Sequence, residues 1–177
     1  MDGYGFHEGY FAPKKYYDQQ TRPKKLSSSF YEGSFHQGLG RALWFVEGCD
    51  PARVAAVINR FDETMHSHMW AGIGLASTYA GGVSESVLRE LVSTSGKHAN
   101  WLAQGCVFAT KARQRAGNPV DHGELACLVL TGLSMDQAVA LSDSVESGLD
   151  HADEGAYEIW RQSLRLHFAT NLMGVTS

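Results

Sequence analysis

The chain has 177 residues, of which 44% are hydrophobic and 19% charged, with 19 glycines and 4 prolines. This length suits one domain with a core of its own, and so little proline excludes a disordered, proline-rich linker protein. The net charge of −4 gives no overall basic field for nucleic acid, and no apolar run approaches the ~20 residues that span a bilayer. The three cysteines lack CxxC spacing and predict free thiols, and therefore a cytoplasmic protein.

Glycine-rich segments recur along the chain at a nearly fixed spacing. Three of them begin at Gly38, Gly72 and Gly105, and a related segment begins at Gly3, so the intervals are 35, 34 and 33 residues. Within a segment, positions i, i+4 and i+7 share one helical face, where Gly and Ala let a neighbouring helix approach closely. The recurrence predicts an all-α, solenoid-like array of helical hairpins with a ~33–35-residue repeat.

The first segment is followed by residues 12–29, which carry no apolar stripe and are predicted to form a long basic loop. Its charged residues are Lys14, Lys15, Asp18, Arg22, Lys24 and Lys25. A solvated loop is the common fate of such a segment. Interleaved with Tyr16 and Tyr17, the bases would also suit an acidic partner such as a carrier protein, or single-stranded nucleic acid, which the net charge of −4 disfavours.

Later helices have recognisable beginnings. The Asp50–Pro51 pair predicts a helix start, because Asp caps well and Pro is tolerated at the first helical position, and Ser84 and Ser134 mark two further starts. A last amphipathic helix, over residues 156–169, is predicted to cap the C-terminal end. We therefore expect residues 1–177 to form a single helical-repeat domain.

Four separated runs of sequence are distinctive: residues 1–11 (MDGYGFHEGYF), 37–46 (QGLGRALWFV), 70–82 (WAGIGLASTYAGG) and 156–161 (AYEIWR). In this order they resemble the family of unknown function encoded in enediyne polyketide biosynthesis clusters. The resemblance extends from residue 1 to about residue 168, and this chain resembles the C-terminal half of typical members. It implies a pathway, and since the family has no established reaction, it implies no mechanism.

The candidate ligand-binding residues are Asp2, His7, Gln37, Arg41 and Trp44. Gln37, Arg41 and Trp44 fall at i, i+4 and i+7, beside the glycine face, and Arg over Trp could hold an anionic or planar group. The plainer alternative is that Arg41 pairs with an acid such as Asp2 or Glu32 and orders the fold. His7 beside a carboxylate could act as a general base, although a structural histidine is commoner.

Other segments carry residues at positions that match Gln37, Arg41 and Trp44. They are Asp2, Phe6, Ala71, Leu75, Gln104, Phe108 and Lys111. In a helical-repeat array such positions line the concave side, where partners bind. We therefore expect a partly polar, partly aromatic surface there, with no catalytic residue and no cofactor.

The run Met65–Met69 contains His66 and His68, which resemble half of a metal site. Histidines at i and i+2 do not share a helical face, although a loop could bring them together. Two donors are too few for structural zinc, so we expect no metal.

We expect a non-catalytic accessory or scaffold protein of enediyne-type polyketide (antibiotic) biosynthesis. It would bind a pathway protein or a polyene intermediate, and neither nucleic acid nor membrane. One alternative is a tailoring enzyme acting on the polyene, with Asp2, His7, Arg41 and Trp44 in its pocket. The other is a general helical-repeat interaction module.

The N-terminal end presents an unusual group of aromatic residues. They are Tyr4, Phe6, Tyr10 and Phe11. No second helix of their own unit follows to cover them, and monomers rarely tolerate an apolar patch of that size. We therefore expect a homodimer through this end, which a self-complementary patch can form without another gene product.

Overall fold

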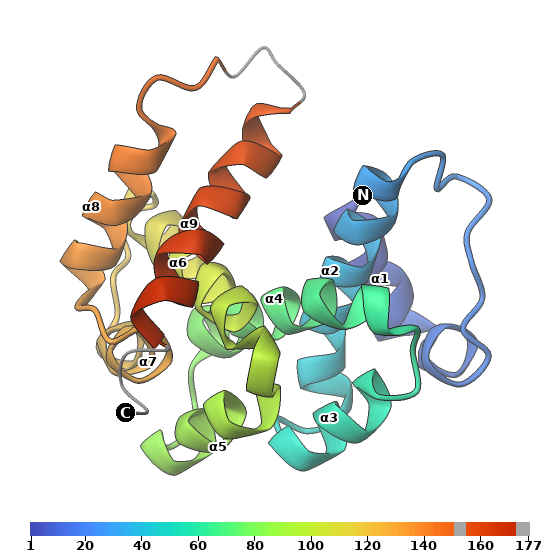
Figure 1. The fold of residues 1–177 in the computed structure, drawn as a ribbon. Coiled ribbons are helices and arrows are strands. Elements are labelled where there is room, and N and C mark those ends of the chain that lie inside the picture. Colours follow the sequence, from blue (N-terminus) through green and yellow to red (C-terminus); the bar gives the residue numbers. More distant parts are fainter. Residues whose placement is uncertain (151–154, 173–177) are drawn as a thin grey trace.

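The computed structural model describes residues 1–150 and 155–172, and within these ranges every regular element is helical (Figure 1). The α-helices are α1 (Asp2–Phe11), α2 (Ser29–Val46), α3 (Pro51–Ile58), α4 (Glu63–Ala80), α5 (Glu85–Ser95), α6 (Ala99–Arg115), α7 (Asp121–Thr131), α8 (Met135–Glu146) and α9 (Ala156–Leu172). A π-helical turn (Lys14–Asp18) and a 3₁₀ turn (Gly96–His98) complete the described elements. The predicted all-α class is confirmed.

Helices α1, α2, α4 and α6 pack against one another in that order and form a central stack. Glycine pairs make the three crossings: Gly5 with Gly38, Gly40 with Gly72, and Gly74 with Gly105. At Gly72, for example, an added Cβ would lie 2.7 Å from the backbone nitrogen of Arg41 and closer still to the carbonyl oxygen of Gln37. The backbones therefore touch, as the glycine spacing predicted.

Gly3 departs from this pattern, since an added Cβ there would meet nothing within 4 Å. Gly3 matches Gly38 and Gly72 in the repeat, and those glycines face the preceding helix of the stack. Because α1 is the first helix of the stack, Gly3 faces open space and Gly5 makes the contact with α2.

Helices α3, α5 and α7 pack in sequence beside the central stack. The predicted caps are largely confirmed: the Asp50 carboxylate accepts the backbone N–H groups of Ala52 and Arg53, and Ser134 forms a capping box with Gln137. Ser84 precedes α5 as predicted, but its hydroxyl contacts Ser86 and makes no cap bond.

Residues 12–29 were predicted to be one long loop, and the structure corrects this in part. Residues Lys14–Asp18 form the π-helical turn, in which Tyr16 and Tyr17 are buried. The Tyr17 hydroxyl donates to the carbonyl of Leu39 at 2.8 Å, and the Tyr16 hydroxyl donates to Glu8. Two buried tyrosines are too few to give the sequence the repeated apolar positions by which an amphipathic helix is predicted.

Helix α9 begins at Ala156, as predicted, and its last described residue is Leu172. It lies along α6 and α8 on the flank of the stack (Figure 1). Two of its arginines reach glutamines of α2 and α6, so α9 covers a side of the stack as well as its C-terminal part.

Over the described residues, no single helix combines the length and apolar character needed to cross a membrane. Helices α7 and α8 meet the criterion only when taken together, and they are bent by 66° relative to each other.

Candidate ligand-binding groove

Two adjoining clefts open on one face of the central stack. The first has a volume of about 380 Å³ and is lined by Phe6, Arg41, Phe45, Leu75, Ala76, Tyr79, Ala80, Phe108, Ala109 and Ala112. The second has a volume of about 410 Å³ and is lined by Asp2, Gln37, Arg41, Leu75, Phe108, Lys111, Ala112, Arg115, Tyr157 and Trp160. They share Arg41, Leu75, Phe108 and Ala112, so they form one groove, with an apolar cleft and a charged cleft.

Residues at nearly constant spacing in the sequence line this groove. Phe6, Arg41, Leu75 and Phe108 are spaced at 35, 34 and 33 residues and come from four successive helices of the stack. All four line the apolar cleft. These four residues agree with the expectation that matching helical positions share one surface. Ala71 and Gln104 do not, since both are buried and line neither cleft.

Asp2, Gln37 and Arg41 are brought together by the α1–α2 crossing. One Asp2 carboxylate oxygen accepts from the Gln37 amide at 2.8 Å, and the other pairs with the Arg41 guanidinium. That guanidinium lies 5.0 Å from the centre of the Phe6 ring, which adds a cation–π contact. Arg41 thus orders the α1–α2 pair, as the plainer alternative expected, and it also lines both clefts.

His7 and Trp44 do not line the groove. The His7 side chain is 65% exposed, beside Glu8 and Phe11, whereas Trp44 is fully buried in the core. At about 100° per residue, Arg41 and Phe45 lie roughly 40° and 80° to one side of Gln37, and Trp44 lies about 20° to the other. The groove therefore receives Phe45, and Arg41 stacks on Phe6 in place of the expected Trp44.

Gln37 also anchors α9. Its amide oxygen accepts from Arg161 at 2.9 Å, and the equivalent Gln104 on α6 accepts from Arg165 at 3.1 Å. Both arginines are buried and share the carboxylate of Glu158. Burial, partly offset by Glu158, lowers the pKa of Arg165. Sequence reasoning missed this cluster, although the matching positions of the two glutamines were visible.

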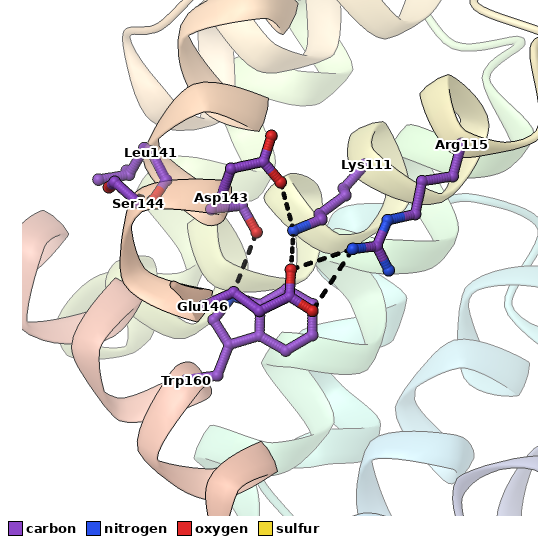
Figure 2. Close-up of polar contacts among 8 residues, drawn as sticks. Lys111, Arg115, Leu141, Asp143, Ser144, Glu146 and Trp160 are labelled. Carbon is purple, nitrogen blue, oxygen red and sulfur yellow. Dashed lines mark hydrogen bonds and ion pairs between the residues drawn. The ribbon is translucent and has the colours of Figure 1, made fainter. Parts of the chain in front are cut away.

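Lys111 lines the charged cleft and lies at the centre of a network of polar contacts, which Figure 2 shows. Its side chain is only 4% exposed, and its Nζ atom lies 2.7 Å from Asp143, contacts Glu146, and sits 4.7 Å from the centre of the Trp160 ring. Arg115 donates to the same Glu146 carboxylate at 3.1 Å. Hydrogen bonding from Lys111 lowers the pKa of Glu146. This network fixes the wall that α6, α8 and α9 share.

His66 and His68 lie in α4 and have separate surroundings. His66 bonds the carbonyl of Phe61 at 2.9 Å, and His68 packs edge-on against Trp101 with ring centres 5.0 Å apart. Because this segment is helical, it does not bring the two imidazole rings together as a loop could. Over the described residues, no group of three or more His, Cys, Asp or Glu side chains has the arrangement of a metal site.

All three cysteines are free thiols. Cys106 and Cys127 are buried side by side between α6 and α7, with their sulfurs 3.8 Å apart. Burial raises the pKa of Cys106, and the hydrogen bond from Cys106 lowers that of Cys127.

Comparison with known proteins adds one identification. No curated protein and no solved structure matches the chain. A family model described as a protein of unknown function (DUF1702) matches residues 1–168, which agrees with the expected membership of a family of unknown function. The chain therefore belongs to the DUF1702 family.

Proposed function

We propose that this protein is a non-catalytic accessory protein of enediyne-type polyketide biosynthesis that holds an elongated polyene intermediate in its groove. The choice of pathway comes from the resemblance of the four sequence runs. The choice of a small apolar ligand, in preference to a pathway protein, comes from the groove.

The apolar cleft carries this proposal. Apart from Arg41, every residue that lines it is apolar or aromatic, and its volume of about 380 Å³ is typical of small-molecule sites. Phe45 and Tyr79 remain 39% and 41% exposed at its edge, although large apolar side chains are costly to leave in water. A conjugated chain is flat and apolar, so it can cover these rings and stack against them.

The charged groups of the groove favour binding over catalysis. Asp2 is engaged by Gln37 and Arg41, and Lys111 is engaged by Asp143 and Glu146. A general base or acid has to exchange a proton with its substrate. Groups held in ion pairs along the charged cleft are better suited to shaping and orienting a ligand, which favours the binding role over the tailoring enzyme.

We also propose that the chain is a solenoid-like array. The three glycine crossings at constant spacing support this view, as does the second row formed by α3, α5 and α7. In such an array the groove is the concave face, which helical-repeat proteins use for binding.

The test is a fluorescence titration with the methyl ester of all-trans-parinaric acid, a linear conjugated tetraene that brightens in apolar surroundings. We expect saturable binding to the wild-type protein. Ala112→Trp fills the groove from an exposed position shared by both clefts and should abolish saturable binding. Ala56→Trp, on the exposed side of α3, is the matched control and should bind normally.

Equal binding by the two variants, or none by the wild type, would contradict the proposed site. Mass spectrometry of the recovered tetraene separates the alternatives. An unchanged mass agrees with a binding protein, and a changed mass would favour the tailoring enzyme.

A further inference from the structure

The groove consists of two chemically different clefts. The apolar cleft is walled by aromatic and aliphatic side chains, whereas three cations, Arg41, Lys111 and Arg115, line the charged cleft together with one carboxylate, Asp2. Four shared lining residues join the two clefts. A ligand that fills both has to be amphipathic.

The acids near the charged cleft are already engaged. Asp2 accepts from Gln37 and Arg41 through its two oxygens, and Glu146 accepts from Lys111 and Arg115. Asp143 contacts Lys111 from a position that is 59% exposed. The three carboxylates therefore hold the three cations in place and balance their formal charge, so a further anion would depend on the hydrogen-bond donors that remain.

Two guanidinium groups keep donors for a further anion. A guanidinium has five N–H donors. Within residues 1–150 and 155–172, Arg41 pairs with Asp2 through Nη1, and Arg115 pairs with Glu146 through Nη2. Arg41 comes from α2 and Arg115 from α6, so they approach the charged cleft from two helices of the stack.

Arg41 and Lys111 are held in place before any ligand binds, and Arg115 extends into solvent with a contact to Glu146. Arg41 is stacked on Phe6, and Lys111 is buried over Trp160, where it holds Glu146 against Arg115. Donors that are already oriented bind an anion with less loss of side-chain freedom. Lys111 is therefore a positioning residue, and Arg41 and Arg115 are the residues that would contact the ligand.

We propose that the groove binds an elongated, unsaturated carboxylic acid, with its carboxylate on Arg41 and Arg115 and its chain in the apolar cleft. This inference rests on the proposed function and makes it more specific: the polyene is held as a free acid and in one direction. Carboxylate pairing with guanidinium is strong and geometrically specific.

The test compares all-trans-parinaric acid with its methyl ester, which has the same tetraene chain and no charge. We expect the wild-type protein to bind the acid at least about tenfold more tightly than the ester. Raising the salt concentration should reduce this ratio, because salt screens the charged contact and leaves the apolar one unchanged.

Arg115→Met and Arg41→Met should each lower the acid-to-ester ratio towards one. Arg115 is 63% exposed, so its variant should keep the fold, which circular dichroism checks. Arg89→Met is the matched control: it makes the same change of net charge on α5, outside the groove, and should leave the ratio unchanged.

The outcomes separate the two proposals. Equal affinity of the wild-type protein for acid and ester overturns this inference and leaves the polyene-binding function standing. A ratio that keeps its wild-type value in both groove variants also overturns it. Failure of both probes to bind overturns the proposed function as well.

Discussion

Gly72 provides the sharpest test of how this chain folds. Removing a glycine from a helix normally stabilises it, and Ala gains about 0.8–1.0 kcal/mol over Gly in helix propensity. At Gly72, however, a Cβ would lie 2.7 Å from the Arg41 nitrogen, where ordinary contact begins at 3.4 Å. The α2 and α4 backbones would have to separate by at least about 0.7 Å, and overpacking of this kind costs about 1–3 kcal/mol.

We therefore expect Gly72→Ala to lower the melting temperature, with Gly72→Leu worse, by about 2–4 °C for each kcal/mol lost. Gly123→Ala in α7 is the matched control. Its Cβ would meet the flexible side-chain sulfur of Met135 at 3.1 Å and Val120 at an ordinary contact distance of 3.8 Å. Helix propensity should therefore dominate, and stability should hold or rise. Melting curves followed by circular dichroism measure both. If Gly72→Ala stabilises the protein as much as the control does, the close crossing is refuted.

Burial and the nearby charge of Arg161 lower the pKa of His68 to about 3, from 6.5 in an unfolded chain. The neutral histidine therefore contributes stability that is complete above about pH 6.5 and is lost as the pH falls towards 3. Between pH 7 and pH 5 this loss lowers the free energy of unfolding by up to about 2 kcal/mol. His68→Gln removes the titrating group, so urea titrations of the variant should show a fall that is smaller by up to this amount. Identical pH dependence in the variant would contradict this. Asp50→Ala should lower the free energy of unfolding by about 1 kcal/mol, because Asp50 caps α3. Ser84→Ala should lower it by less in the same titrations, because the Ser84 hydroxyl makes no cap bond. Equal losses would contradict the assignment of Asp50 as a cap and Ser84 as none.

The stack was predictable because its cause is local and repeated. A glycine at a helix crossing leaves a mark in the sequence, and the 33–35-residue spacing says which glycines are equivalent. The sequence could not say which glycines pair, since Gly38 faces α1 whereas Gly40 faces α4. That choice depends on the order of helices in space, which also explains why Gly5 packs and Gly3 does not.

The site was predictable where residues at equivalent positions in the recurring segments line it. Positions matching Arg41 line the groove, because equivalent residues on stacked helices fall in one row. Trp44 was misplaced because a seven-residue step is about 20° short of two helical turns, enough to move it from the groove to the core. The contact of Gln37 with Arg161 joins residues 124 positions apart and has no periodic signal.

We still expect a second copy of the chain to bind at the N-terminal end. Of the four aromatic side chains there, two are packed against α2 and two remain exposed. Tyr4 packs on Phe35 and Phe6 on Phe45, whereas Tyr10 and Phe11 remain 47% and 71% exposed.

Gly3 makes α1 a suitable dimer contact. It matches the crossing glycines in the sequence, but an added Cβ there would meet nothing within 4 Å, so a second α1 can approach there as α2 does at Gly5. Gly3→Leu should therefore block the two-fold contact without destabilising the monomer, because leucine is the better helix former and has open space. Light scattering should show a wild-type dimer, with Gly3→Leu and Phe11→Asp monomeric and their helix content unchanged. Leu166→Asp, a similarly exposed apolar position on α9, is the control and should stay dimeric. A monomeric wild-type protein, or a dimer that survives both α1 variants, would remove α1 as the contact.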